Sequence, residues 1–398
     1  MRVLCLGNMN NNFFSLVRYL RDRGHDAHLM PQGYEPAHFD PSCDAGDDSH
    51  QTFMRRLDWP EPPSFTGLDL AAFRAMASSY DFVIGCGFAP ALMHEAGLRL
   101  DLFLPYGSDL YEVAFPGHPA YARIQEAQAQ GIRRARFVSY GSWPPHLESL
   151  KRLGCAGEIL NLVIPMVYTP SYDPARLRAG CRDTELGDRV LALREESDLL
   201  VVHPTRHVWK TASDPASMKG NDILVRGLRE LIDARPDTRP GLALFEYGPD
   251  VEETRRLVES LGLRDRVAWF PTLPRRQVMA IMAHADAVAT LFVVGGLICG
   301  SMSEGLLMGK PLLGFREDHK HRGQFPTIYE IMNAGTPEQV RDRLCEWYDD
   351  PQRHRAMGEA GRRWLMENII DMALDTIEGL MRGERMGAAG LAAAGTSG

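Results

Sequence analysis

The chain has 398 residues, 44% of them hydrophobic and 24% charged, and carries a formal net charge of -8 at pH 7. This length exceeds the size at which one hydrophobic core usually keeps growing, so two domains are expected, and the globular composition argues against wholesale disorder. The negative net charge disfavours a nucleic acid partner, because such binding relies on Lys and Arg neutralising phosphates over a broad surface.

The seven cysteines are spread along the chain, with no Cys-x-x-Cys pair and no histidine at metal-ligand spacing. They are therefore expected to be reduced thiols that hold no metal. The chain opens on an apolar strand rather than on the charged start and long apolar stretch of a signal peptide, and no apolar run approaches the length that spans a bilayer. The expected compartment is the cytoplasm.

The first half of the chain alternates short apolar runs with helical spacing. Arg2–Gly7 is predicted to be a strand, residues 13–20 repeat apolar side chains at helical spacing, and Ala27–Met30 returns to an extended pattern. Residues 31–63 are rich in Pro, Asp, Gly and Ser and are predicted to form a long surface excursion. Further strands are predicted at Tyr80–Ile84, Leu102–Pro105, Phe137–Tyr140 and Glu158–Ile164. Alternating strands and helices indicate a parallel sheet.

A second alternation of the same kind follows a turn-rich stretch at 165–174. The predicted strands are Leu199–His203, Leu242–Glu246, Val267–Trp269, Ala287–Leu291 and Pro311–Phe315. The predicted helices are Asn221–Ala234, Val251–Leu261, Arg275–Ala285 and Ser301–Met308. A strongly helical stretch from Pro337 to about Arg385 closes this half.

The α/β pattern predicts a division into two Rossmann-like domains. We expect an N-terminal domain over 1–170, a linker over 171–198 and a C-terminal domain over 199–370. A C-terminal helix over 371–386 follows, with packing back on the N-terminal domain left open, and the Gly/Ala-rich residues 387–398 are expected to be disordered. Ligands are expected in the cleft between the domains, where the carboxyl ends of the strands face it.

The most informative stretch spans residues 293–312. Gly295, Gly296 and Leu297 form a glycine loop ahead of a predicted helix, and that helix carries Glu304 at the start of the run Glu-Gly-Leu-Leu-Met-Gly-Lys-Pro-Leu. Glycines let backbone N–H groups approach a diphosphate at a helix start, where the helix dipole favours anions. An ordinary glycine turn is the alternative interpretation of the loop taken alone.

This stretch resembles the donor-site segment of the large family of retaining GT-B glycosyltransferases (glycosyltransferase group 1, family 4-like). In that family a glycine-containing loop and a helix start precede an acidic residue and an EAMAxGKPV run. The resemblance implies a GT-B fold, with two Rossmann-like α/β domains facing a central cleft. It also implies that Glu304 accepts hydrogen bonds from the ribose hydroxyls of a nucleotide, for which a carboxylate on a rigid helix is suited.

Two cations, Arg206 and Lys219, follow the first strand of the second half and resemble the family's Gly-Arg and Lys-Gly-x-Asp-x-Leu segments. The resemblance implies that both pair with the donor pyrophosphate and offset the charge that develops on the leaving nucleoside diphosphate. Residues 209–214 make this loop longer than in many members, which leaves the placement of Arg206 open. Ordinary surface positions for both cations are the alternative.

The stretch 261–271 resembles the family's LGLxDRVxFxG segment, whose end forms the nucleobase pocket. By this resemblance Pro271 and Thr272 lie at the base. Glu246 and Pro271 replace glycines often seen at the matching positions, so the identity of the base stays open.

In the first half, the turn over 105–110 resembles the family's HGxDL turn near the acceptor and the transferred sugar. Tyr106 stands where His is common, and a phenol with an ordinary pKa near 10 is a poor general base at neutral pH. Asp109 is the better candidate for holding an acceptor or sugar hydroxyl, with a helix N-cap as its alternative role. Gly7 and Asn8 stand in the family's first loop, beside the donor phosphates or the acceptor, with a solvated turn as the alternative.

The resemblance implies transfer of a glycosyl unit from a nucleotide-diphosphate sugar to an acceptor hydroxyl, with retention at the anomeric carbon. In that scheme the leaving diphosphate oxygen takes the acceptor proton, so no metal ion and no cofactor is required. Gly296 departs from the family, because many members carry there a Glu that contacts the transferred sugar. A different donor sugar, use of backbone N–H groups, and lost activity are the open explanations.

Three alternatives to a retaining transferase remain. An inverting GT-B transferase or a GT-B sugar epimerase would use Asp109 as a general base. A catalytically silent GT-B subunit would bind a partner transferase or a glycan. Stereochemistry of the product separates the first two from retention, and the nucleotide-binding residues argue against the third.

Two groups of arginines raise the question of peripheral contact with the inner face of a membrane. They are Arg18, Arg21 and Arg23 on the first predicted helix and Arg133, Arg134 and Arg136 further along. A core-facing helix with a solvated face is the alternative. The acceptor and the oligomeric state stay open.

Overall fold

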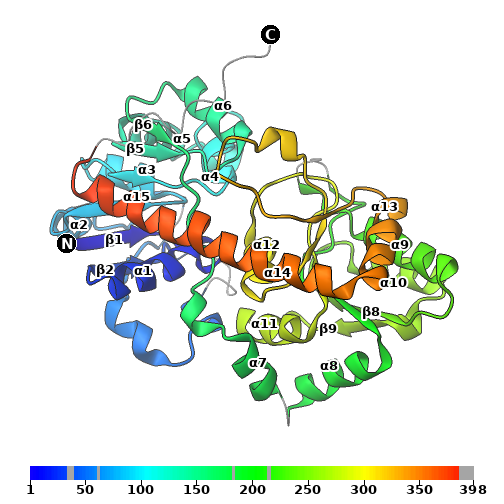
Figure 1. The fold of residues 1–398 in the computed structure, drawn as a ribbon. Helices are drawn as coiled ribbons and strands as arrows, with labels where there is room; N and C mark the ends of the chain where they lie inside the picture. Colours follow the sequence, from blue (N-terminus) through cyan, green and yellow to red (C-terminus); the bar gives the residue numbers. More distant parts are fainter. Residues whose placement is uncertain (34–39, 61–62, 182–183, 213–216, 385–398) are drawn as a thin grey trace. The chain divides into compact units, whose positions relative to one another are not determined.

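The fold was derived from a computed structural model, which describes residues 1–33, 40–60, 63–181, 184–212 and 217–384. The chain divides into two compact units (Figure 1). Unit 1 comprises residues 1–168 together with the chain from 368 onward, and unit 2 comprises residues 169–367. The predicted disordered tail, 387–398, lies outside the described residues.

Unit 1 is built on a six-stranded parallel sheet in the order β2-β1-β3-β4-β5-β6. Its strands are β1 (Arg2–Leu6), β2 (Asp26–Met30), β3 (Phe82–Gly85), β4 (Leu102–Phe103), β5 (Phe137–Ser139) and β6 (Glu158–Leu160). Helices connect successive strands, as a parallel sheet requires. They are α1 (Asn12–Asp22), α2 (Leu70–Ala77), α3 (Ala89–Glu95), α4 (Ser108–Tyr111), α5 (Gln125–Arg134) and α6 (Pro144–Leu153) (Figure 1). The strand order reverses between β1 and β3.

The apolar stripe of α1 is buried in unit 1, which is the core-facing interpretation of that helix. Its arginines are also engaged. Arg18 pairs with Asp44 at 3.1 Å and lies over two aromatic rings, and the Arg21 guanidinium donates to the carbonyl of Ala27 at 3.0 Å. Peripheral membrane contact therefore gains no support from this helix.

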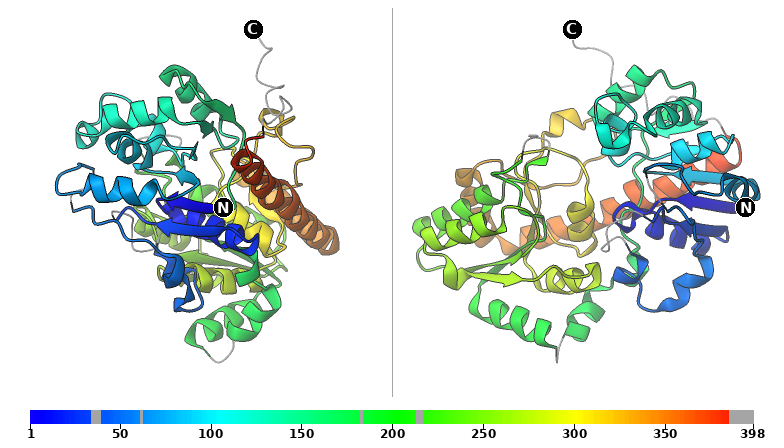
Figure 2. Two further views of the ribbon diagram at one scale, coloured as in Figure 1. Left: turned by 90° about the vertical axis from the view of Figure 1, so that its left-hand side faces the viewer. Right: turned by 180° about the vertical axis from the view of Figure 1, so that it is seen from behind.

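Unit 2 contains a second sheet (Figure 2). It is parallel and has six strands in the order β12-β11-β10-β7-β8-β9. The strands are β7 (Leu199–His203), β8 (Pro240–Phe245), β9 (Val267–Phe270), β10 (Ala287–Ala289), β11 (Leu312–Gly314) and β12 (Met332–Asn333). Counted from β7, this is the 3-2-1-4-5-6 order of a Rossmann sheet, and the order reverses between β7 and β10. The connecting helices are α9 (Asn221–Ala234), α10 (Val251–Ser260), α11 (Arg275–His284), α12 (Gly300–Leu307) and α13 (Pro337–Asp349).

The stretch 171–198, which the sequence predicts to be a linker, contains two helices, α7 (Pro174–Cys181) and α8 (Glu185–Glu196). Helix α7 packs on α11, and α8 packs on α11 and on strands β7 and β8. Both belong to unit 2. The turn-rich and polar composition of this stretch concealed them, because their buried faces are narrow: α7 buries Cys181 alone.

The helical stretch predicted at the C-terminus is interrupted rather than continuous. Helix α13 ends at Asp349, α14 spans Pro351–Leu365, and a π-helical segment leads into α15 (Met372–Met381). Helix α15 belongs to unit 1, where Arg23 reaches Asp375 at 2.6 Å and Glu378 at 3.1 Å. The C-terminal helix is thus anchored to the C-terminal end of α1 through Arg23.

Candidate functional site

The loops with the predicted donor residues lie at one edge of the unit 2 sheet. Arg206 follows β7, the glycine loop follows β10, and Pro271 with Thr272 follows β9. These strands are parallel, so their carboxyl ends share an edge. His203 Nδ1 lies 3.0 Å from the carbonyl oxygen of Ala289, which places the ends of β7 and β10 side by side at the reversal of strand order. In open α/β sheets this is where ligands bind.

The loop after β7 is held by one buried amide, Asn221. Its Oδ1 accepts from the Val208 N–H at 3.0 Å, and its Nδ2 donates to His203 Nε2 at 2.9 Å and to the Arg206 carbonyl at 3.4 Å. Asn221 is fully buried at the start of α9, after Gly220 in the left-handed region. The Lys-Gly-Asn sequence therefore folds α9 back onto the strand end.

A second buried anchor, Asp250, fixes the next part of the loop. One carboxylate oxygen accepts from the backbone N–H groups of Trp209, Lys210 and Thr211 at 2.7, 2.8 and 3.2 Å. Burial alone would raise the pKa of Asp250, but the backbone donors outweigh it and hold the pKa below its usual value. The carboxylate is therefore ionised at neutral pH, and the loop carrying Arg206 is pre-organised.

Arg206 itself is exposed, and within the part of the chain that the structure describes its guanidinium makes no hydrogen bond or ion pair. Lys219 is half-buried, and its backbone bridges two loops: its N–H donates to Val208 at 2.7 Å, and its carbonyl accepts from Phe292 at 3.0 Å. The second bond ties the loop after β7 to the start of the glycine loop. The two predicted cations thus come from one folded substructure.

The three residues of the glycine loop have different surroundings. A Cβ added to Gly295 would lie 3.0 Å from the backbone nitrogen of Glu317, whereas one added to Gly296 would meet nothing within 4 Å. The Gly296 N–H already donates to the Val294 carbonyl at 3.0 Å, and Leu297 is buried. Gly295 is therefore closely packed against the backbone at Glu317, while Gly296 faces open space.

This difference gives a matched pair of substitutions. We expect Gly295→Ala to lower the free energy of unfolding by about 1–2 kcal/mol, because the backbone beside it must shift. Gly296→Ala is expected to be neutral or slightly stabilising, since it only restricts the unfolded chain. Urea denaturation of both variants measures the contrast, and equal stabilities would contradict the loop geometry.

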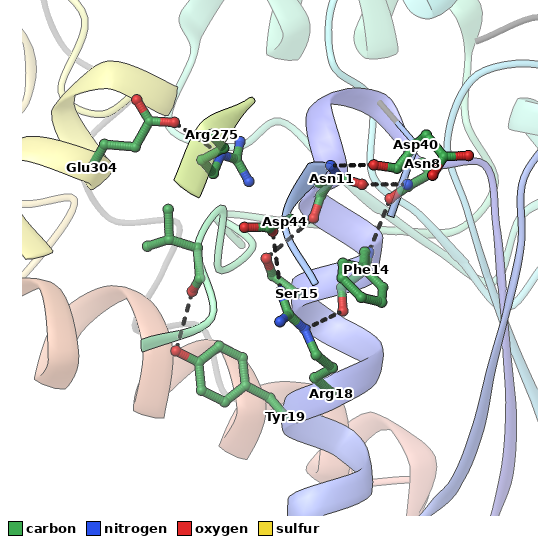
Figure 3. Close-up of polar contacts among 11 residues, drawn as sticks. Asn8, Asn11, Phe14, Ser15, Arg18, Tyr19, Asp40, Asp44, Arg275 and Glu304 are labelled. Atoms are coloured by element: carbon green, nitrogen blue, oxygen red, sulfur yellow. Dashed lines mark hydrogen bonds and ion pairs between the residues drawn. The ribbon is translucent and has the colours of Figure 1, made fainter. Parts of the chain in front are cut away.

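Glu304 lies on α12 and is paired with Arg275, the first residue of α11 (Figure 3). Glu304 Oε1 is 2.9 Å from Arg275 Nε, and their side chains are 13% and 8% exposed. Contact of the Glu304 carboxylate with ribose hydroxyls stays a prediction. Removing Glu304 would also take one partner from the buried Arg275 guanidinium, which is costly in itself.

The Gly-Lys pair that ends the matched run has a structural role. Gly309 adopts a φ of +66° just after α12, a conformation that favours glycine. Lys310 Nζ donates to the carbonyls of Ala283 and Ala285, at 3.1 and 2.6 Å, where α11 ends. This pair therefore joins the C-terminal ends of α12 and α11.

At the predicted base pocket, Pro271 and Thr272 are both exposed. The Thr272 hydroxyl donates to the carbonyl of Glu246 at 3.0 Å, which joins the loops after β8 and β9. Their contact with a nucleobase stays a prediction.

Two buried histidines beneath these loops are neutral at pH 7. Burial lowers the pKa of His203 to about 4 and that of His207 to about 3, with repulsion from His203 adding to the second shift. His203 Nδ1 must carry the proton, because its partner is the Ala289 carbonyl. His207 Nδ1 lies 2.9 Å from the Thr254 hydroxyl.

These histidines predict acid lability. Their pKa values in the folded protein lie below the unfolded value of about 6.5, so the unfolded chain takes up protons first as the pH falls. The stability contributed above pH 6.5 is lost progressively towards pH 4, by about 3 kcal/mol for each histidine. Urea denaturation between pH 7.5 and 4.5 should show this slope. His207→Asn should flatten it and exposed His319→Gln should not; parallel slopes in all three would contradict the prediction.

In unit 1, Gly7 and Asn8 serve the fold. Gly7 has a φ of +92°, and an added Cβ would lie 2.7 Å from Cys86 Sγ, so the loops after β1 and β3 approach closely. The Asn8 side chain accepts from the Phe14 N–H at 3.0 Å and donates to Asn11 at 2.7 Å, and it is 1% exposed (Figure 3). Its amide thus satisfies an N–H group in the first turn of α1, and a place beside the donor phosphates or the acceptor stays a prediction.

The Asp109 carboxylate also hydrogen bonds to the backbone of unit 1. One carboxylate oxygen accepts from the Gly87 N–H at 3.0 Å, and the other accepts from Tyr106 and Gly107 at 3.1 and 2.9 Å. The side chain is fully buried. Asp109 therefore ties the loop after β3 to the turn after β4 and does not serve as the N-cap of α4, while its contact with an acceptor or sugar hydroxyl stays a prediction. Tyr106 is half-buried in that turn.

Sequence reasoning missed two buried amides that complete this arrangement, Gln32 and Gln128. Gln32 donates to the Cys86 carbonyl and accepts from the Phe88 N–H, each at 3.0 Å. Gln128 donates at 2.9 Å to the carbonyls of Gly87 and Asp109. No local pattern distinguishes these glutamines from surface residues, because their partners lie 19 to 56 positions away along the chain.

Among the described residues, no group of three or more His, Cys, Asp or Glu side chains is placed to hold a metal ion. Within the same part of the chain, every helix is too short or too polar to cross a membrane.

Comparison with solved structures identifies the fold. HepE from Anabaena, solved in complex with UDP, superposes with a TM-score of 0.62 at 16% identity, covering 96% of this chain and 100% of that one. Together with the two Rossmann-type sheets, this correspondence is decisive. The fold is GT-B.

Curated relatives match parts of the GT-B chain. A GDP-mannose-dependent alpha-(1-6)-phosphatidylinositol monomannoside mannosyltransferase from Mycolicibacterium smegmatis is 29% identical over 163 residues, 38% of this chain and 41% of the relative. A D-inositol 3-phosphate glycosyltransferase from Segniliparus rotundus is 25% identical over 212 residues, 50% and 44% of the two chains. The matches thus span less than half of each relative. No family model matches the chain.

Within the GT-B fold, the predicted site residues separate into two groups. Those of unit 2 lie on loops and helices that follow the carboxyl ends of the strands. In unit 1, the side chains of Asn8 and Asp109 accept hydrogen bonds from backbone N–H groups of other residues. The anchors that sequence reasoning missed in unit 2 are Asn221 and Asp250. The position of Asp250 directly before a helix is a signal that sequence reasoning could have used, although its carboxylate bonds the loop after β7 rather than the helix.

Proposed function

We propose that the chain is a glycosyltransferase that moves a sugar from a nucleotide-diphosphate sugar to an acceptor hydroxyl, and that unit 2 holds the donor. The observation that carries this proposal is the exposed Arg206 on a loop locked by Asn221 and Asp250, at the strand reversal of a Rossmann sheet. A guanidinium held there, without a partner in the part of the chain that the structure describes, is suited to a pyrophosphate, which it can bind through two parallel hydrogen bonds.

In the proposed reaction, an acceptor hydroxyl oxygen attacks the anomeric carbon while the bond from that carbon to the β-phosphate oxygen breaks. The departing phosphate oxygen takes the acceptor proton, so the step needs no protein base. Arg206 and Lys219 offset the charge that grows on the leaving diphosphate. We propose retention of configuration and independence of metal on this basis.

The arrangement of Asp109 supports retention over inversion. An inverting transferase or an epimerase would need a carboxylate that reaches the acceptor hydroxyl, and Asp109 is fully buried, with both oxygens accepting backbone hydrogen bonds. A silent binding subunit would have no need of a pre-organised Arg206 loop. The retaining transferase therefore accounts for the most features.

The names of the similar proteins suggest two candidate donor nucleotides. The mycobacterial relative is named for GDP-mannose, and the HepE structure holds UDP. The names of the relatives also suggest an inositol-containing acceptor, with or without a lipid. We include these acceptors in the proposal as the first to be tried.

Titration calorimetry of the full chain with GDP, UDP, ADP and dTDP tests the donor site. We expect one nucleotide to bind at least about tenfold more tightly than the others, and the matching nucleotide sugar to be slowly hydrolysed. NMR of the first product reports the anomer, and EDTA should leave the rate unchanged. Absence of binding to all four nucleotides would overturn the proposal.

A further inference from the structure

Two side chains of the segment 315–329, which follows β11, hydrogen bond to carbonyl oxygens of the glycine loop after β10. His321 is 2% exposed, and its Nε2 lies 2.8 Å from the carbonyl oxygen of Gly295. Because a carbonyl only accepts, Nε2 carries the proton and donates it to this bond. The backbone of the same segment packs against Gly295, at 3.0 Å from an added Cβ.

A second side chain of the segment holds the other end of the loop. Tyr329 is 4% exposed, and its hydroxyl donates to the carbonyl oxygen of Leu297 at 2.7 Å. Burial raises the pKa of Tyr329 to about 12, so the hydroxyl keeps its proton throughout the neutral range. The loop thus has two of its carbonyls tied to one segment.

Arg316 in turn holds Tyr329. Its guanidinium lies over the Tyr329 ring, 4.4 Å from the centroid, and donates to the Tyr329 carbonyl at 2.7 Å and to Asp318 at 2.5 Å. Arg316 is 2% exposed. The ring is therefore held by stacking on one face and through its own backbone, which leaves its hydroxyl little freedom to turn away from the loop.

The two tied carbonyls decide where the loop's N–H groups point. In a trans peptide, the C=O of one residue and the N–H of the next point in opposite directions. Fixing the Leu297 carbonyl towards Tyr329 therefore turns the Ile298 N–H away from it, and that N–H has no hydrogen-bond partner among the described residues. It precedes the first turn of α12, where the Cys299 side chain provides no cap.

We propose that Arg316, His321 and Tyr329 form a brace that positions the 295–298 loop for the donor diphosphate. This inference rests on the proposed transferase function and adds positioning residues to it. None of the three needs to touch the donor. Their effect is to fix the loop before the donor arrives, so that binding does not have to order it.

Tyr329→Phe removes one oxygen atom and its bond to the loop while keeping the packed ring. We expect it to raise the KM for the nucleotide sugar and the Kd of the free nucleotide about tenfold, with the acceptor KM unchanged. His321→Leu should act in the same direction, and His321→Gln, which can still donate to Gly295, should recover part of the loss.

Trp364→Phe is the matched control. The Trp364 indole N–H donates to the Thr327 carbonyl at 2.7 Å, and its ring packs on Tyr329 with centroids 4.8 Å apart, yet that bond is not to the glycine loop. A brace predicts that only Tyr329→Phe and His321→Leu weaken nucleotide binding, even when all three variants lose similar stability.

The outcomes separate this inference from the function on which it rests. If the wild-type chain binds a nucleotide diphosphate and Tyr329→Phe binds it equally well, the brace is overturned and the transferase proposal stands. The brace is also overturned if Trp364→Phe weakens binding as much as Tyr329→Phe does. If the wild-type chain binds no nucleotide, both proposals fall.

Discussion

Replacing Asp109 by alanine is expected to lower the free energy of unfolding by about 3–5 kcal/mol at pH 6. The substitution leaves three buried backbone N–H groups, those of Gly87, Tyr106 and Gly107, without their acceptor. Each buried donor without a partner costs about 1–3 kcal/mol, and water entering the space recovers part of that. Urea denaturation followed by tryptophan fluorescence measures the loss.

Asp109 should also make the stability of unit 1 depend on pH. Burial raises the pKa of Asp109 to about 7, although four backbone hydrogen bonds oppose the shift. The folded protein therefore binds a proton between pH 4 and 7 that the unfolded chain releases, so the contribution of Asp109 is present below pH 4 and is lost as the pH rises through 7. Asp109→Asn should remove this trend.

Asp58→Asn serves as the control for charge alone, because Asp58 is exposed in the same unit. It should leave both the stability and its pH dependence unchanged. A stability of Asp109→Ala within about 0.5 kcal/mol of wild type would contradict the anchoring role and reopen Asp109 as a ligand-binding residue.

Arg206→Ala is expected to lower kcat/KM for the nucleotide sugar by about 10²–10³-fold while leaving the fold intact. The loss combines a charge-assisted hydrogen bond to the pyrophosphate with the positive charge that stabilises the leaving group. Folding should not change, since the guanidinium is exposed and has no partner within the described part of the chain. Steady-state kinetics and thermal unfolding measure the two effects separately.

Two further variants sharpen the test of Arg206. Arg206→Lys keeps the charge but loses the planar fork, so we expect an intermediate effect. Arg264→Ala removes an 80% exposed arginine at the start of β9, the opposite edge of the sheet, and should leave donor kinetics unchanged. If Arg206→Ala bound and turned over the donor like wild type, the pyrophosphate would have to lie elsewhere.

A single substitution does not isolate the role of Glu304, because losing its carboxylate also disturbs Arg275. A double-mutant cycle of Glu304→Gln and Arg275→Gln separates the pair energy from the nucleotide contact.

The alternation of apolar strands and helices was sufficient to predict the α/β class and most strands. Strand β7 lies at Leu199–His203, as expected, because five consecutive buried apolar or neutral side chains admit few alternatives. The same alternation placed Arg206 and the glycine loop directly after strands, and in a parallel sheet this brings them to one edge. Helices α7 and α8 escaped prediction because each buries few residues.

What the sequence determined by itself was the secondary-structure order, the two-part organisation and the loops that could face a donor. Only the tertiary structure decided that Asp109 and Asn8 bind their own backbone, that Glu304 pairs with Arg275, and that a distant segment braces the glycine loop. The physical reason is that periodicity reports which face of an element is apolar. The partner of a buried polar group is fixed by long-range packing, such as the 29 positions that separate Arg275 from Glu304.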